Sequence, residues 1–239
     1  TRRDLEVLER IYANSVLLGD DGPDGWGITY VREFDMTGDS KLFPPRPEWE
    51  AKGYRPDEYG RWIGPEGEVA LPLYQGGMLH QFDFAAAAFG GGSGHSVRWD
   101  TIAWTEKRFA PQYLMGEDHS VDRGIRPGVV RIAYRYIANP TNQRTMIATL
   151  AAPYPCGHTI GVLLPAAEKR QGLPALCAIL NALSFDFVMR LGFSGSGGAG
   201  ALDPSKVFEK PAPPENGKMA SVFTEPVLRL NCPSSVVAE

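Results

Sequence analysis

One stretch of the chain, residues 123–167, contains five arginines and no aspartate, glutamate or lysine, although the whole chain of 239 residues has a formal net charge of −4. Within it, residues 128–137 alternate, with Val130, Ile132, Tyr134 and Tyr136 on one side and Arg131, Ala133 and Arg135 on the other. Alternation with a period of two is typical of a half-buried β-strand. The stretch therefore predicts a strand whose arginines leave a common cationic face, with all acidic residues of the chain placed elsewhere.

A cluster of turn-forming residues, 139–143, follows this strand, and residues 144–150 alternate again. The pattern predicts a β-hairpin with Arg135, Asn142, Gln143 and Arg144 near its tip. Guanidinium groups bind phosphate oxygens or the edge of guanine through two hydrogen bonds, and carboxamides bind adenine in the same way. Such a tip is chemically suited to nucleic acid. A hairpin whose arginines are merely solvated is the alternative that composition leaves open.

Residues 134–150, followed by Gly157-His158-Thr159, resemble a signature of large bacterial adenine-specific DNA methyltransferases. That signature is R-x-I-(x)-N-x-T-N-x-R-T-x-I-A followed by G-H-T. The family includes combined restriction-modification enzymes and relatives in phage-defence systems, and the signature lies in their target-recognition region. Four further segments resemble the same family in the same order along the chain: residues 34–43, 71–83, 180–190 and 227–231.

The resemblance implies sequence-specific recognition of double-stranded DNA, with base edges read in the major groove beside phosphate contacts. It also implies that a catalytic methyltransferase domain of the same polypeptide binds S-adenosylmethionine and transfers the methyl group to adenine N6, with or without an accompanying nuclease. This chain itself is then expected to hold no cofactor and no catalytic residue. The residues carried over as DNA contacts are Arg131, Arg135 and Arg144 for phosphate or guanine, Asn142 and Gln143 for bases, His158 and Thr159 for the backbone, and Thr145, His80 and Gln81 as further candidates.

Several positions depart from the family pattern. Gln75 stands where the family usually has Glu, Gly77 where it has Lys, and Phe84-Ala85 where a His-Arg pair commonly follows the aspartate; residues 198–203 only approximate its G-G-T-H-L-N segment. These departures keep a second hypothesis open, a protein-interaction scaffold within a phage-defence complex whose arginines dock to an acidic partner. DNA binding with a sequence preference would decide between the two.

The composition predicts one α/β (α+β) domain over residues 1–239, built on a mixed or antiparallel sheet with hairpins. We expect an N-terminal lobe over residues 1–70, a β-rich recognition core over 71–165, and a helix with a wrapping tail over 166–239. Apolar residues at helical spacing predict a long packing helix near residues 173–191, and Pro211 begins an extended C-terminal segment. An amphipathic helix over residues 4–12 and a strand over 26–34 are also expected.

The sequence pI near 5.6 argues against a free-standing general DNA-binding module, which typically has a pI above about 9. Cys156, Cys177 and Cys232 are odd in number and widely spaced, so free thiols and a cytoplasmic location are expected. No contact with a membrane is expected, because the most apolar stretch, residues 173–191, is interrupted by polar and charged residues. Since the recognition region of the family follows a large catalytic domain, and the chain begins with Thr1, we expect a piece of a longer polypeptide.

Motifs for independent catalysis are weak. An amino-methyltransferase needs a (D/N)-P-P-(Y/F/W) loop to hold the flipped base, and residues 43–46 lack both its amide and its aromatic. The glycine-rich residues 193–200 follow a helix instead of a strand, which disfavours a cofactor loop. Glu50 and Lys52 match the end of a nuclease pattern but lie in an expected helix. The histidines and cysteines lack metal-ligand spacing. An independent hydrolase remains a third hypothesis.

Overall fold

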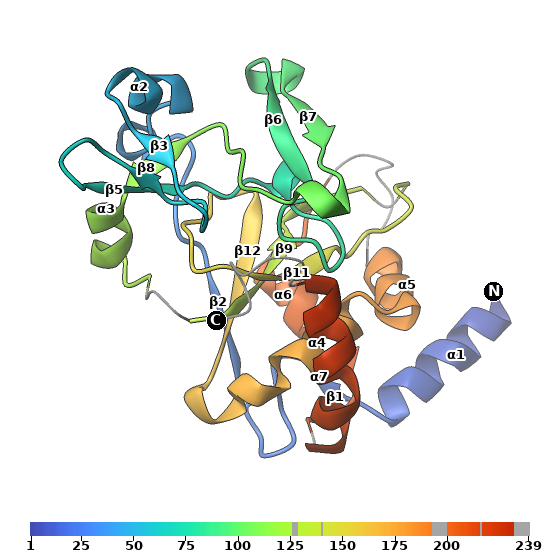
Figure 1. Ribbon diagram of the computed structural model, residues 1–239. Coiled ribbons are helices and arrows are strands. Elements are labelled where there is room, and N and C mark those ends of the chain that lie inside the picture. The colour runs from blue at the N-terminus through green and yellow to red at the C-terminus, as the bar shows by residue number, and fades with distance from the viewer. Residues whose placement is uncertain (126–128, 140, 193–199, 216, 232–239) are drawn as a thin grey trace.

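A four-stranded antiparallel sheet in the order β11–β9–β12–β2 lies at the centre of the molecule (Figure 1). Its strands are β2 (Ile28–Val31), β9 (Arg131–Arg135), β11 (Ala148–Ala151) and β12 (Ile160–Pro165). The computed structural model describes residues 1–125, 129–139, 141–192, 200–215 and 217–231. The chain is thus of the mixed α/β class with antiparallel sheets, as the sequence predicts.

The predicted hairpin is present, because β9 pairs with β11 in an antiparallel register that sets Tyr134 opposite Ala148. The predicted half-exposure of its strands is wrong. One face of the sheet, with Ile132 and Leu150, packs against the helices, whereas the other, with Ala133, packs against a second core formed by loops and aromatic side chains. Residues 131–134 and 148–151 are consequently buried on both faces.

A second four-stranded antiparallel sheet, in the order β3–β4–β5–β8, forms a smaller layer beside the first. Its strands are β3 (Arg55–Pro56), β4 (Trp62–Ile63), β5 (Val69–Pro72) and β8 (Leu114–Gly116), flanked by α2 (Arg46–Ala51) and α3 (Glu117–Asp122). A separate hairpin of β6 (Ala87–Gly91) and β7 (Arg98–Thr101) projects at the top of Figure 1. Minor pairs join β1 (Val16–Leu17) to β14 (Pro211–Ala212) and β10 (Ile137–Ala138) to β13 (Gly200–Ala201).

Five short 3-10 turns and a short α-helix complete the connections in the described residues: η1 (Ser40–Leu42), η2 (Gly76–Met78), η3 (Gly94–Ser96), η4 (Trp104–Glu106), η5 (Ala167–Gly172) and α6 (Pro204–Phe208). The expected long helix near residues 173–191 is two helices, α4 (Leu173–Leu180) and α5 (Leu183–Leu191), and the helical segments 167–180 and 183–191 are bent by 67°. The break occurs at Asn181, whose Nδ2 donates to the carbonyls of Cys177 (2.9 Å) and Ala148 (2.8 Å). Its Oδ1 accepts from the Ala148 amide (3.1 Å), so this residue joins the helix end to the sheet.

The C-terminal prediction is correct only up to β14, because α7 (Gly217–Asn231) follows where an extended tail was expected. Asn231 at its end accepts from the Thr149 hydroxyl (2.7 Å) and the Leu150 amide (2.9 Å). Within the part of the chain that the structure describes, no single helix is long and apolar enough to cross a membrane. The segments 167–180 and 183–191 pass such a test only together, and α4 is a buried core helix.

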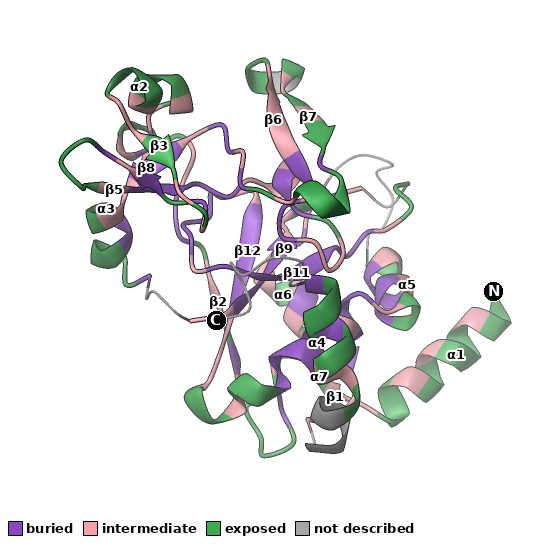
Figure 2. Ribbon diagram, in the orientation of Figure 1, coloured by how far each residue is buried: buried purple, intermediate pink, exposed green. Residues whose placement is uncertain are grey.

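The N-terminal helix α1 (Arg2–Ala13) forms as its spacing predicts, and Thr1 caps it in a capping box with Asp4. None of its residues is buried, and Figure 2 shows it standing apart from the purple core. Leu5 is 61% exposed and Tyr12 is 40% exposed. Leu8 and Ile11 on the same face are half-buried, and the Tyr12 hydroxyl donates to the Glu209 carbonyl (3.4 Å), so the described chain covers this face only in part.

Two cysteines lie in the core as free thiols. Burial raises the pKa of Cys177 to about 12, and burial together with the nearby Glu33 carboxylate raises the pKa of Cys156 well above its usual range. Because the thiolate is the reactive form, we expect neither to react with Ellman's reagent at about pH 8 until the protein is unfolded. Cys232 lies outside the described residues. Rapid labelling of Cys156 or Cys177 in the folded protein, identified by peptide mapping, would contradict this.

Candidate nucleic-acid interface

Helix α5 fixes the start of the returning strand at the hairpin tip. Asp186 is buried, and its Oδ1 accepts hydrogen bonds from the backbone amides of Thr145 (2.7 Å) and Met146 (2.8 Å). Its other oxygen, Oδ2, pairs with Nε of Arg190 at 2.9 Å. These two amides have no ladder partner of their own in the described sheet, so the carboxylate supplies the acceptor that burial requires.

Arg190 holds the turn itself. Its Nη2 donates to the carbonyl oxygens of Asn142 (2.7 Å) and Gln143 (2.6 Å). The side chains of both residues are exposed to solvent. A guanidinium bound to two consecutive carbonyls restricts the backbone and leaves both carboxamides exposed.

The two residues after Gln143, Arg144 and Thr145, differ in how far they are exposed to solvent. Arg144 is half-buried, and its Nη1 is buried without a hydrogen-bond partner among the described residues. Thr145 is 1% exposed, and its hydroxyl likewise lacks a partner there. Thr145 is therefore part of the hairpin's interior in this structure, and its role as a DNA contact stays a prediction.

Arg135, at the end of β9, bonds the η2 segment. Its Nε and Nη2 both donate to the carbonyl of Leu79, at 2.9 Å and 2.5 Å. His80 follows directly, and its imidazole is near enough to Arg135 to respond to it: partial burial and the positive charge lower the pKa of His80. A histidine with a lowered pKa is neutral near pH 7, so this ring offers hydrogen bonds there without adding positive charge.

A groove of about 390 Å³ brings two of the predicted residues together. Two of its lining residues, Arg135 and Thr159, were predicted as DNA contacts; the others are Gln75, Gly76, Gly77, Gly94, Val97, Trp99 and Ile137. Thr159 fixes one wall, because its hydroxyl accepts from the Gly76 amide at 2.9 Å. The groove separates the β6–β7 hairpin from the segment that leads through β10 to the hairpin tip.

His158 and Gln81 hold neighbouring segments. Nδ1 of His158 accepts from the Met36 amide (3.0 Å), which fixes the proton of the neutral ring on Nε2. Nε2 of Gln81 donates to the carbonyl of Asn181 (3.3 Å), at the break between α4 and α5. Both side chains are half-buried, so the structure gives each a positioning contact within the fold.

Arg131 is in the interior, where the strand pattern predicted a solvent-exposed arginine. It is 3% exposed and forms a buried ion pair through Nη1 with Glu33, while Nη2 donates to the Tyr154 carbonyl. The other carboxylate oxygen of Glu33 accepts from the Cys156 amide at 2.8 Å. Because a buried guanidinium needs a partner charge, the distant Glu33 supplies one that alternation within the strand could not reveal. Arg131 is therefore not carried into the function proposed below.

The expected common cationic face is also absent from the described arginines of residues 123–167. Arg123 pairs with Asp39 at 2.6 Å and lies over the ring of Phe34. Arg126 lies outside the described residues. Arg131 is buried and Arg135 is bonded to a carbonyl, so these arginines do not form one exposed surface, although Arg123 and Arg131 both bond Glu33.

Sequence reasoning missed the residues that position the tip, Asn181, Asp186 and Arg190. A signal was present, because these three polar residues interrupt an otherwise apolar helical stretch that was interpreted only as packing. It also missed Trp99, which comes from a short strand far from the hairpin in sequence and lines the groove.

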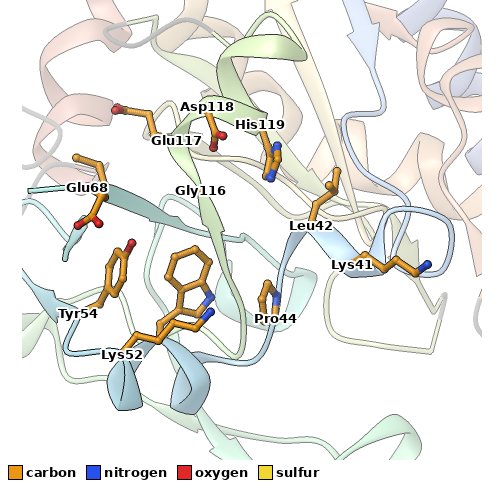
Figure 3. A pocket seen from close by; sticks show the side chains of 12 residues that line it. Lys41, Leu42, Pro44, Lys52, Tyr54, Glu68, Gly116, Glu117, Asp118 and His119 are labelled. Carbon is orange, nitrogen blue, oxygen red and sulfur yellow. The ribbon is translucent and has the colours of Figure 1, made fainter. Parts of the chain in front are cut away.

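A second pocket, of about 490 Å³, lies in the smaller layer and contains none of the predicted contacts (Figure 3). Figure 3 shows Glu117 and Asp118 on the α3 side and Lys52 on the α2 side, so charges of both signs line it. The ring of Trp49 is already in contact with Tyr54, at 4.9 Å between centroids, and with the Lys52 ammonium. This pocket offers no single ligand chemistry.

The metal-ligand, glycine-rich-loop and nuclease patterns considered in the sequence correspond to no site among the described residues. Among the residues that the structure describes, no group of three or more His, Cys, Asp or Glu side chains could hold a metal ion. Most of the glycine-rich segment, residues 193–199, lies outside the described residues. Glu50 lies in α2, as expected, and not in a strand.

Comparisons with known proteins do not assign this chain to a family. No protein-family model matches the chain, and no curated protein sequence matches it. Among solved structures, the chain is similar to the HsdS subunit from Thermoanaerobacter tengcongensis, with a TM-score of 0.26 and 16% sequence identity. The match covers 99% of this chain and 44% of that one, so the chain spans less than half the length of that subunit. A likeness at this TM-score is too weak to assign a fold or a function.

Proposed function

We propose that this chain recognises a specific sequence in double-stranded DNA for an adenine-specific DNA methyltransferase or restriction-modification enzyme. The observation that carries the proposal is the hairpin tip: Asn142 and Gln143 expose their carboxamides while Arg190 holds their carbonyls. Paired donors and acceptors on a fixed backbone suit the edge of adenine in the major groove. Arg144 beside them supplies a guanidinium for phosphate or guanine.

The position of the family-like segments supports the proposal. Residues 134–150 form the hairpin, residues 180–190 provide Asp186 and Arg190 that hold it, and Thr159 and residues 71–83 meet at the adjacent groove. Segments that resemble one family in sequence thus contact one another around one feature. In the proposed assembly, a partner methyltransferase domain binds S-adenosylmethionine and performs the chemistry, while this chain selects the site.

We expect selection from a random duplex pool to recover a preferred site, and Asn142→Ala to weaken binding to that site by about 1–3 kcal/mol while leaving scrambled duplexes unaffected. Arg144→Ala will either act in the same way or weaken binding to all duplexes alike and lower the salt slope by about one, depending on whether it grips guanine or phosphate. The measurement is affinity at several salt concentrations.

The matched control is Gln171→Ala, an exposed carboxamide in η5, away from the hairpin, which should change neither affinity nor salt slope. If Asn142→Ala and Arg144→Ala also leave both unchanged in folded protein, the hairpin is not the DNA face.

The alternative is a protein-interaction scaffold within a phage-defence complex. The observation that favours it is α1, where Leu5, Val7 and Tyr12 are 61%, 42% and 40% exposed. Uncovered apolar side chains of this kind are typical of surfaces that contact other proteins. A chain that selects no sequence from the duplex pool would favour this alternative.

A further inference from the structure

The groove beside the hairpin is lined by both apolar and polar side chains. Trp99, Val97 and Ile137 provide apolar surface, and Ile137 is 47% exposed. Gln75, Thr159 and Arg135 provide amide, hydroxyl and guanidinium groups. Small-molecule sites combine mostly apolar lining with a few placed polar groups in this way. A planar ligand with polar edges matches such a mixed lining.

Trp99 is held in place against the polypeptide backbone. A Cβ added to Gly77 would lie 2.3 Å from Nε1 and 2.5 Å from Cδ1 of the indole, so the ring packs directly on this glycine. Across the hairpin, Phe89 meets the indole edge-on, with 5.9 Å between ring centroids. The half-buried indole is therefore a rigid aromatic surface, fixed before any ligand arrives.

Gln75, which lines the groove, has an unsatisfied acceptor. Its Nε2 donates to Oε1 of Gln112 at 3.2 Å, which sets the orientation of the amide. Its own Oε1 is buried and has no hydrogen-bond partner among the described residues. An acceptor without a partner is costly, so a small rotation of this amide toward a ligand N–H in the groove would be favoured.

We propose that this groove binds one unpaired nucleobase, stacked on the indole of Trp99 with its polar edge toward Gln75 and Thr159. Aromatic stacking is tolerant of base identity, since every base has a π-face, and Arg135 at the same groove suits the attached phosphate. The inference rests on the proposed function, and adds to it that DNA on this surface has one base displaced from its stack.

The test compares a fully paired duplex with the same duplex carrying one extra unpaired adenosine, using the whole chain. We expect the bulged duplex to bind more tightly, and Trp99→Ala to reduce its affinity about 5- to 150-fold while changing affinity for the paired duplex little. Trp99→Phe should retain part of the preference. Gly77→Ala, which pushes a methyl group into the indole, should reduce it without removing the ring.

The matched control is Trp104→Ala, a tryptophan that is 45% exposed and does not line the groove. It should leave the preference intact, and circular dichroism should show all variants folded. Equal affinity of the unaltered chain for bulged and paired duplexes would overturn the nucleobase site and leave duplex recognition standing, as would a preference that survives both Trp99→Ala and Gly77→Ala. Absence of binding to any duplex would overturn the proposed function itself, and this inference with it.

Discussion

Arg131→Met is expected to destabilise the fold by about 3–5 kcal/mol, because it leaves the carboxylate of Glu33 buried without a partner charge. Each side chain of this pair is 3% exposed, so water cannot replace the lost guanidinium. The Tyr154 carbonyl loses a donor in the same variant. Urea unfolding followed by circular dichroism measures the loss.

The pH dependence of this loss has a defined sign. Burial raises the pKa of Glu33 above its ordinary value, and Arg131 opposes that rise; without Arg131 the pKa is higher still. A raised pKa in the folded state means that the folded protein binds the proton more tightly than the unfolded chain. The deficit of Arg131→Met relative to the unaltered protein should therefore shrink as the pH falls through the raised pKa of Glu33 in the variant.

Replacing both partners, as Arg131→Met with Glu33→Leu, should recover much of the stability, since no isolated charge remains buried. Recovery should be incomplete, because the Cys156 amide loses its acceptor. A destabilisation by Arg131→Met below about 1 kcal/mol, joined to weaker binding of all duplexes, would restore the original interpretation of Arg131 as a phosphate contact.

The second large effect is expected at Asp186. Asp186→Ala should destabilise the protein by about 2–4 kcal/mol, because two buried amides, those of Thr145 and Met146, lose their acceptor and Arg190 loses its ion pair. Hydrogen exchange of these amides should accelerate more than that of β9, since the change is local to the tip. Binding to the preferred duplex should weaken as well.

Asp186→Asn separates geometry from charge. The amide keeps one oxygen for the two backbone donors but turns an N–H toward Arg190, so an intermediate loss is expected. Asp21→Ala, at an exposed position, is the control and should stay within about 0.5 kcal/mol. If Asp186→Ala leaves both exchange and stability unchanged, the carboxylate does not hold the tip.

The local sequence pattern predicted the β-hairpin correctly but did not predict which of its faces are buried. Alternation and turn chemistry are properties of neighbouring residues, so β9, the turn and β11 follow from them. Which faces are buried depends on what packs there, and the partner of Arg131 is Glu33, 98 positions away. Ala133, interpreted as facing solvent, is a small residue that lets the second core approach the sheet closely.

Tertiary contacts also determine where the helices end and which of their faces are covered. Apolar spacing across residues 173–191 is nearly continuous, yet Asn181 ends the first helix by bonding Ala148 on β11. Amphipathic spacing in α1 predicted a helix correctly but could not show that the described chain covers its apolar side only in part. Both outcomes depend on tertiary contacts that no periodicity contains.

The attachment of the hairpin tip has a consequence for how such a protein changes over generations. Arg190 bonds the carbonyls of Asn142 and Gln143, and none of the bonds described at the tip from α5 involves their side chains. Replacing either carboxamide with another polar group leaves these hydrogen bonds to the backbone carbonyls in place. Under the function proposed above, one or two replacements at these exposed positions would change the recognised sequence while the bonds from Arg190 that hold the turn remain in place.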